Sequence, residues 1–520
     1  MRNTRDLAIW LAVGLAGALL LTFFYPRVFP LLPEGWEISR AEAEMIALER
    51  LRDLGDPVEN PYIVVRLRSD SQLERRMQLL VGREGGPDLE TLRASEPADS
   101  FLAWDVRVFE PGAVPSEWTY LAVISRSGEV LTLRRESWEE GDAEDRLDAA
   151  DARLEAADFL RQQGFDPAQF EDDPEIQRDE VGSQTGMVLR YQRNEMVFGR
   201  SYPYGVEVYF DRGQASGFSF WFDDPHIDDL QSTFRDIQLV NFGRVAFFYF
   251  LLPLVAVPFL KRYHDGQLGV RRGLQFFTVS LGAAFVFVVL NSHIFSAGSN
   301  LGFLSRQQTT WMVGGFSLIF QFLGLAVLAL MSWSVGESLC RERWPQKLAA
   351  IDALFRLKWS NTTVALSMLR GLAGGTLMAG VLFALSTLGQ GLGAWPLTSL
   401  IYNGNGFDSA LPVVSFLTGV VCYYVPIYLF VCLLVPCWAT ARFGSTLGLI
   451  LALATAAVIA PVLIVLPLGW GWILWAVVAG IPVLLFRFGD LLSGLMAGLT
   501  AVLLITKVVP ALHVADATIQ

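Results

Sequence analysis

The chain holds 520 residues, of which 52% are hydrophobic, and this is too apolar for an ordinary soluble protein. Its charge is unevenly divided. The stretch between Glu34 and Asp236 carries 44 acidic residues and 22 arginines but no lysine, whereas the rest carries 8 acidic and 18 basic residues. Because an acidic surface repels phosphate, this balance argues against nucleic acid as a partner. All four cysteines lie outside the acidic stretch, which therefore has no disulfide framework.

An apolar run from Leu7 to Tyr25 follows Arg2 and Arg5. It is close to the ~20 residues that cross a bilayer core as a helix. A secretory signal peptide would look similar, but it would end in small residues, and the bulky Phe23-Phe24-Tyr25-Pro26-Arg27 stands here instead. We therefore predict that residues 1–29 form an uncleaved N-terminal transmembrane anchor.

Residues 30–237 are predicted to form an acidic extracytoplasmic α+β domain with two weak repeats, at residues 37–135 and 146–222. Each repeat begins with a helix, which Ser39 or Asp148 can cap. Each repeat then holds two strand-like segments around a turn, a pattern typical of a β-hairpin. We expect two helix-plus-hairpin units, an architecture that resembles PepSY-type extracytoplasmic domains. The predicted hairpins pair Thr119–Ser125 with Glu129–Leu133, and Gly205–Phe210 with Ala215–Phe220.

Residues 238–520 are predicted to form a membrane domain of eight helices, which brings the total to about nine transmembrane helices. Most Lys and Arg residues fall in alternate loops, and the positive-inside rule places these loops and the N-terminus in the cytoplasm. The acidic domain is then extracytoplasmic, and in a bacterium the chain belongs to the inner membrane. The predicted spans are Phe242–Leu260, Gly273–Asn291, Trp311–Trp333, Val364–Leu388, Leu411–Trp438, Leu447–Leu468, Trp470–Phe486 and Leu491–Val509.

Ionisable side chains near the span ends are the candidates for chemistry, and Glu337 is the most informative of them. A carboxylate at the end of a membrane helix needs a polar boundary, a wet cavity or a partner. Arg341, four residues on, shares its helical face. Glu337 is therefore either half of a boundary ion pair or part of a membrane-embedded site. Convergence of Glu337 with Arg370 and Asp490 would favour the embedded site.

Histidines give little support for a metal site. A zinc site needs three or four convergent ligands. The sequence has no HExxH pattern and no two histidines spaced i, i+4. The four histidines are His226, His264, His293 and His513.

One segment reads Gly336-Glu337-Ser338-Leu339-Cys340-Arg341, followed by Arg343-Trp344-Pro345-Gln346-Lys347-Leu348 and Asp352-Ala353-Leu354. It resembles the first motif of the CPBP family, Glu-Glu-x-x-x-Arg. This family comprises type II CAAX prenyl protease-like and bacteriocin-processing intramembrane proteins. The resemblance implies that Glu337 and Arg341 are catalytic. It also implies that Glu337 binds Zn²⁺ or another divalent metal, which would activate water for peptide cleavage.

The remaining family pattern is eroded. Gly336 replaces the first Glu of the motif, Gly498 stands where a later His would, and Val502 stands where Asn would. One hypothesis is an intramembrane metalloendopeptidase with an eroded metal site, acting on a peptide or a membrane protein. The alternative is a non-catalytic membrane-anchored sensor or scaffold that binds a protein partner through its extracytoplasmic domain. A transporter is a third class, because the glycine-rich spans allow close helix packing. Membrane lipid is an expected partner in every case.

Overall fold

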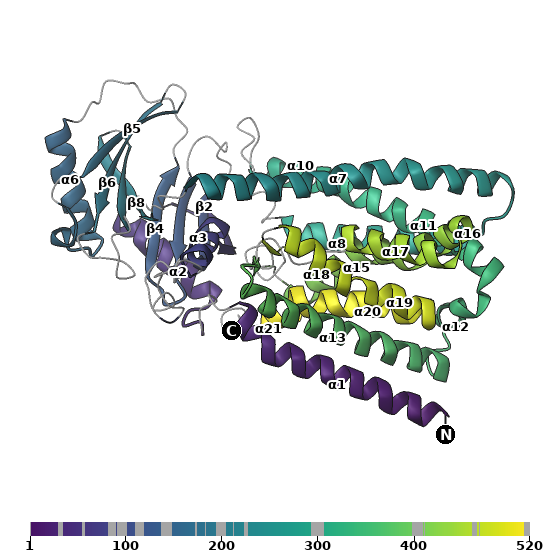
Figure 1. Ribbon diagram of the computed structural model, residues 1–520. Coiled ribbons are helices and arrows are strands. Elements are labelled where there is room, and N and C mark those ends of the chain that lie inside the picture. The colour runs from purple at the N-terminus through teal and green to yellow at the C-terminus, as the bar shows by residue number, and fades with distance from the viewer. Residues whose placement is uncertain are drawn as a thin grey trace. The chain divides into compact units, whose positions relative to one another are not determined.

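The computed structural model describes residues 2–29, 35–54, 58–81, 90, 101–109, 119–136, 148–171, 174–181, 184–193, 204–211, 213–222, 227–292, 306–397, 409, 411–459, 465–466 and 468–513. The chain is mostly helical and divides into two compact units (Figure 1). The helical unit comprises Met1–Pro30, Ser232–Asn291 and Gly314–Leu512. The sheet unit comprises Leu31–Gln231, Ser292–Val313 and His513–Gln520.

Seven helices among the described residues are long and apolar enough to cross a membrane, which indicates a membrane protein. At both of its ends, each of these helices matches a predicted span to within one residue or extends beyond it. The other two predicted spans fall on α7 and α17, so the count of nine stays a prediction. The seven are Arg5–Val28, Val270–Leu290, Gln307–Arg343, Thr362–Gln390, Pro412–Phe443, Gly469–Phe488 and Leu491–Ala511.

Three long helices each contain one π-helical turn, η2 (Ser317–Phe322), η4 (Phe430–Leu434) and η5 (Leu504–Val508). These turns join α10 to α11, α15 to α16, and α20 to α21 without a break in the helix. The helices outside the sheet are α1 (Arg2–Val28), α7 (Ile227–His264), α8 (Val270–Leu290), α10 (Arg306–Phe316), α11 (Leu323–Arg343), α12 (Ala349–Phe355), α13 (Thr362–Gln390), α15 (Pro412–Leu429), α16 (Val435–Phe443), α17 (Ser445–Ile459), α18 (Leu468–Val478), α19 (Gly480–Phe488), α20 (Leu491–Leu503) and α21 (Val509–His513).

The predicted span Leu447–Leu468 is wrong near its end. Val465 and Leu466 form the short strand β10, which pairs with β9 (Trp395–Pro396), so one helix does not run through to Leu468. The described helix in this span is α17, of 15 residues, and residues 460–464 lie outside the described residues.

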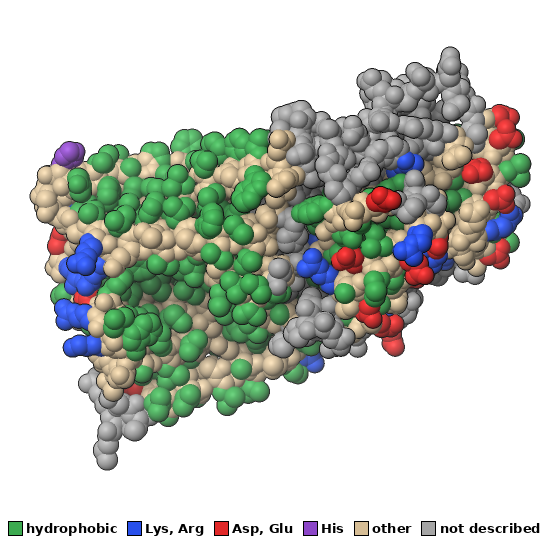
Figure 2. All heavy atoms as spheres, turned by 180° about the vertical axis from the view of Figure 1, so that it is seen from behind, with side chains coloured by type: hydrophobic (Ala, Val, Ile, Leu, Met, Phe, Trp, Pro, Cys, Tyr) green, Lys and Arg blue, Asp and Glu red, His purple; other side chains and the backbone are tan. Residues whose placement is uncertain are grey.

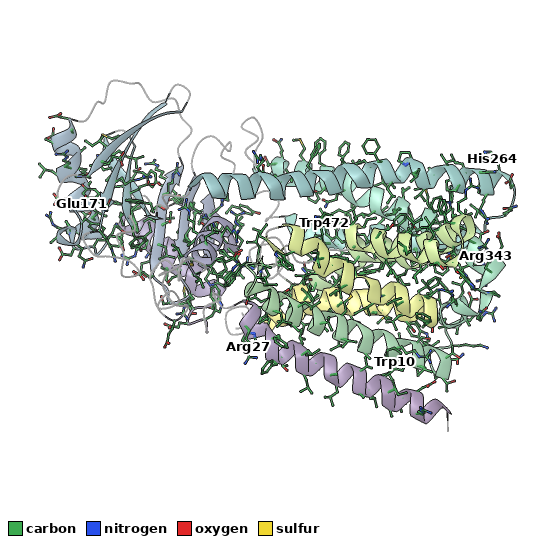
Figure 3. All side chains as sticks on the ribbon, in the orientation of Figure 1. Trp10, Arg27, Glu171, His264, Arg343 and Trp472 are labelled. Atoms are coloured by element: carbon green, nitrogen blue, oxygen red, sulfur yellow. The ribbon has the colours of Figure 1, made fainter. Side chains whose placement is uncertain are left out.

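The described surface of the helical unit separates apolar from basic side chains. Figure 2 shows hydrophobic side chains along its length and Lys and Arg gathered at one end. His264 at the end of α7 and Arg343 at the end of α11 lie at that end, whereas Arg27 and Trp472 lie at the other (Figure 3). The N-terminus of α1 shares the basic end (Figure 1). The predicted basic loops after α7 and α11 therefore lie on one side of the helices.

Close contact between α1 and α13 depends on glycine. A Cβ on Gly17 would stand 2.4 Å from the backbone nitrogen of Leu377, and a Cβ on Gly380 would stand 2.5 Å from the carbonyl oxygen of Gly17. Small residues allow membrane helices to approach in this way. The opposite face of α1 exposes large apolar side chains, among them Leu11, Leu15 and Leu19, as a lipid-facing helix does.

The sheet unit holds one antiparallel sheet of eight strands in the order β1-β2-β3-β4-β8-β7-β6-β5. The predicted hairpins are confirmed as β3–β4 and β7–β8. Sequence reasoning missed the other four strands. It also missed that β4 pairs with β8, which joins the two repeats into one sheet. The strands are β1 (Tyr62–Ser69), β2 (Leu102–Phe109), β3 (Thr119–Ile124), β4 (Val130–Glu136), β5 (Glu175–Val181), β6 (Gln184–Gln192), β7 (Tyr204–Asp211) and β8 (Gln214–Phe222).

Both predicted repeat helices are present, as α2 (Arg40–Asp53) and α6 (Ala149–Gln162). Ser39 caps α2 in a capping box with Glu42, and Asp148 caps α6. α2 packs on β1, β2 and β3, and α6 packs on β8. A further helix, α3 (Ser71–Val81), follows β1. Residues 137–147, which include most of the stretch between the two predicted repeats, lie outside the described residues.

Candidate functional site

Glu337 lies near the end of α11 and accepts hydrogen bonds on both carboxylate oxygens. Its Oε1 accepts from Nε of Arg341 at 2.9 Å and from Nη1 of Arg272, on α8, at 3.2 Å. Its Oε2 accepts from the indole N–H of Trp333, one helical turn earlier, at 2.6 Å. The predicted pair of Glu337 and Arg341 is therefore formed, but it is part of a larger cluster.

Asp352 of α12 completes this cluster. Arg341 donates to it through Nη2 at 2.8 Å and Nη1 at 3.1 Å, and Arg272 donates to it as well. Two guanidinium groups thus alternate with two carboxylates, and the four charges balance. We call Arg272, Glu337, Arg341 and Asp352 the ion-pair ring. It ties together α8, α11 and α12.

Aromatic side chains shield the ring on one side. The ring of Trp333 lies 4.7 Å from that of Phe276 and 5.8 Å from that of Phe355, between centroids. The guanidinium of Arg272 lies 5.1 Å from the centroid of Phe355. Only 13% of the Glu337 side chain is exposed. Ion pairs are stronger in such an environment than in open water.

Electrostatics favour a charged Asp352. Burial alone would raise the pKa of this carboxyl, but hydrogen bonds from Arg341 and Arg272 outweigh burial and hold the pKa below its usual range. Asp352 is therefore a fixed negative charge at neutral pH.

The ring does not fit a divalent metal. A cation bound at Glu337 would face two guanidinium groups, each within 3.2 Å of the same oxygen. Catalytic zinc sites use three protein ligands, usually with histidine among them. Among the described residues, no group of three or more His, Cys, Asp and Glu side chains could hold a metal ion. His226 and His293 lie outside the described residues, and His264 is exposed at the end of α7.

Two positions that resemble family motif positions are closed by packing. A Cβ on Gly336 would stand 2.6 Å from Cγ of Leu433, in η4. A Cβ on Gly498 would stand 2.3–2.5 Å from ring atoms of Tyr428, which is buried. Contacts under 3 Å force neighbouring atoms to move. Neither a Glu at 336 nor a His at 498 fits this arrangement.

The other predicted candidates do not join Glu337. Arg370 pairs with Asp6 of α1 at 3.6 Å. Asp490 caps α20 by accepting from the backbone N–H of Ser493 at 2.9 Å, and it also accepts from the hydroxyl of Ser367 at 2.7 Å. Glu337, Arg370 and Asp490 therefore have separate partners and do not converge on one site.

Sequence reasoning did not connect Arg272, Asp352 or Trp333 with Glu337 and Arg341. Trp333 precedes Glu337 by four residues, and this spacing is a signal that was available. It also missed Lys347, whose Nζ donates to the carbonyl oxygens of Phe486 and Arg487 at 2.7 Å and of Gly489 at 3.1 Å, at the end of α19. A cation is favourable at a helix C-terminus. Burial, and then nearby Arg487, lower the pKa of Lys347.

A second candidate site is the sheet face away from α6. α6 covers the face of Phe218, whose ring lies 6.4 Å from that of Phe159. Ser219 points to the opposite face, since side chains alternate along a strand. The strand register then places one residue from each strand in a line on that face. We call this line the register row: Arg66, Asp105, Val123, Thr132, Ser219, Glu207, Arg190 and Glu175.

Aromatic and charged groups meet along the second half of the row. Glu207 accepts from Nη2 of Arg190 at 2.6 Å and from the hydroxyl of Tyr209 at 2.8 Å. The guanidinium of Arg190 lies 4.5 Å from the ring centroid of Trp221, and that of Arg134 lies 4.7 Å from the ring centroid of Tyr209. Burial, and then Glu207, raise the pKa of Tyr209, so its hydroxyl remains a donor.

Asp105 occupies the first half of the row and is fully buried, with 0% of its side chain exposed. Its Oδ2 accepts from Arg66 at 2.6 and 2.9 Å, and its Oδ1 accepts from Arg107 at 3.1 Å. Burial alone would raise the pKa of Asp105, but Arg66 and Arg107 outweigh burial and hold the pKa below its usual range.

Comparison of the chain with protein-family models, with curated proteins and with solved structures found no match. The geometry of the ring and of the register row therefore carries the functional argument.

Proposed function

We propose that this chain is a non-catalytic membrane-anchored scaffold or sensor, which binds a protein partner through its sheet unit. The observation that carries this proposal is the environment of Glu337. The carboxylate that a CPBP-like protease would use for metal and water is bound by two arginines and a tryptophan. The closed positions Gly336 and Gly498 support the same conclusion.

The register row supports the partner-binding half of the proposal. In its second half, Arg190 lies on the same sheet face as the neighbouring side chains of Tyr209 and Trp221. Arg, Tyr and Trp are the residues most enriched at energetically important positions of protein interfaces. The contact of Arg190 with Trp221, and the hydrogen bonds of Arg190 and Tyr209 to Glu207, hold these side chains in place before binding, which lowers the entropy cost of association.

The proposed location is the bacterial inner membrane with a cytoplasmic N-terminus. Basic residues gather at one end of the helical unit (Figure 2). The N-terminus (Figure 1) and the labelled His264 and Arg343 (Figure 3) lie at that end. The positive-inside rule assigns that end to the cytoplasm. The chain between α1 and α7, which contains the sheet, is then extracytoplasmic.

Metal content of the purified full-length chain tests the non-catalytic half. The wild type, Glu337→Gln and Asp352→Asn are compared after purification with added Zn²⁺ and subsequent dialysis. We expect well under one metal ion per chain in all three. Near-stoichiometric metal in the wild type that is lost in Glu337→Gln would overturn the proposal and favour the metalloendopeptidase.

Photo-crosslinking in intact cells tests the partner-binding half. Benzoylphenylalanine is placed at Trp221, in contact with Arg190, or at Leu154, which is exposed on α6 and serves as the control. We expect discrete protein adducts from position 221 and none from position 154. Equal labelling from both positions, or none from either, would contradict a partner on this face.

A further inference from the structure

An apolar pocket of about 300 Å³ lies inside the helical unit, between α8, α12, α15 and α20. All the residues that line it are apolar, and they include Phe276, Phe355, Val425, Leu495, Met496 and Leu499. Pockets of this size hold small ligands or parts of larger ones. A polar metabolite finds no hydrogen-bonding side chain here, so the lining favours hydrocarbon.

The pocket adjoins the ion-pair ring. Phe276 and Phe355 line the pocket and also pack against Trp333, whose indole donates to Glu337. The guanidinium of Arg272 lies over Phe355. The surroundings thus change from wholly apolar to charged across one layer of aromatic side chains. A phospholipid changes in the same way, from acyl chain to headgroup.

The residues beside the pocket suit a membrane surface. Phe355 is followed by Arg356, Leu357, Lys358 and Trp359, all of which are exposed. Exposed Trp and Leu next to basic residues are typical of segments that lie in the interface of an anionic membrane. Arg271, beside Arg272 on α8, is also exposed. These three basic residues lie outside the ring, so its two carboxylates do not offset their charge.

We infer that this pocket holds an acyl chain of an anionic phospholipid, with the phosphate at Arg271, Arg356 and Lys358. The apolar lining takes the hydrocarbon and the basic residues attract the headgroup. A bound lipid would hold α12 against α8 and α20, beside the ring that already ties α12 to α11.

Photoactivatable lipids test this inference on the full-length chain in nanodiscs. Phosphatidylglycerol and phosphatidylcholine, each with a diazirine on one acyl chain, are crosslinked and the labelled peptides are mapped. We expect labels on α12 and α20, and about fivefold more from phosphatidylglycerol, given the attraction of each basic residue to an anionic surface. The triple variant Arg271→Gln, Arg356→Gln, Lys358→Gln should bring that ratio close to one.

Pocket filling provides the matched control. Met496→Trp should abolish labelling of α12 and α20, whereas Leu274→Trp, on an exposed part of α8, should leave it unchanged. Leu499→Trp gives a second filled pocket if Met496→Trp is not monodisperse. Labelling that is spread over the helical surface, persists in both filled variants, or is equal for the two lipids would overturn the inference.

Discussion

Asp105 in the sheet unit and Glu337 in the helical unit are each held by two arginines. Asp105 of β2 pairs with Arg66 of the neighbouring strand β1 and with Arg107 of its own strand. Glu337 of α11 pairs with Arg272 of α8 and with Arg341 of its own helix. Asp105 is fully buried in a sheet, where a structural role is the ordinary explanation. Glu337 also pairs with two arginines, and the sequence around it resembles a protease motif. The comparison teaches that the partners of a carboxylate, more than its sequence context, indicate what it does.

The largest expected effect is at Asp105. Asp105→Ala leaves two arginines facing a buried position without their counter-charge, and breaking a buried pair costs about 3–5 kcal/mol. We expect the sheet peptides of the full-length chain to lose protection from hydrogen exchange. Asp158→Ala is the control, because its side chain is 66% exposed in an ion pair with Arg161. Unchanged protection in Asp105→Ala would mean that the pair contributes no stability.

Glu337→Gln should have the next largest effect. Hydrogen bonds to charged groups contribute about 1.5–3 kcal/mol each, and the substitution weakens those from Arg272 and Arg341. We expect a lower melting temperature of the helical unit in detergent, with no effect of a chelator on the wild type. Glu342→Gln is the matched control, since Glu342 is 52% exposed and pairs with Arg262. A wild type destabilised by the chelator would indicate a metal instead of a ring.

Gly498→Ala tests whether the second family position is closed. The new methyl group would meet the Tyr428 ring, and overpacking of this kind costs about 1–3 kcal/mol. Gly282→Ala, on α8 with no atom within 4 Å of its Cβ, should instead be neutral or stabilising, because alanine favours helix. Equal effects of the two substitutions in thermal unfolding would mean that position 498 has room for a side chain.

The smallest expected effect concerns pH, because protonation of Asp105 changes the stability of the sheet only in acid. Its pKa is below the usual range when folded, so its contribution to stability is full above about pH 4, the ordinary aspartate value. That contribution is lost as the pH falls through the lower folded pKa. The protection factors of the sheet amides, which are corrected for the pH dependence of intrinsic exchange, should therefore be constant from pH 7 to about 4 and fall below it. Asp105→Asn should remove this dependence, and an unchanged acid transition in that variant would assign it to other groups.

Local patterns in the sequence predicted much of the fold. Ser39 and Asp148 marked the helix starts, the hairpin turns marked β3–β4 and β7–β8, and apolar runs marked seven helices that can span a membrane. These features depend on neighbours within a few residues. The β4–β8 pairing and the register row depend on contacts between distant strands, which no local pattern specifies.

The candidate site was predictable only in part. Arg341 follows Glu337 on the same helical face, so that pair could be found from spacing. Arg272 is 65 residues away on α8, and its contact depends on how α8 packs against α11. Nor could the sequence tell that Tyr428 fills the space beside Gly498, because that contact joins α15 to α20. Long-range packing therefore decides between the two interpretations of Glu337, an ion-pair residue or part of a membrane-embedded site.

A double-mutant cycle between Glu337 and Arg272 tests the central claim most directly. Glu337→Gln, Arg272→Gln and the double variant are compared with the wild type by unfolding in mixed micelles, with Asp158 and Arg161 as the exposed control pair. We predict a coupling free energy of at least about 1 kcal/mol for Glu337 and Arg272, and about zero for the control. Zero coupling between Glu337 and Arg272 would contradict the structural role of Glu337.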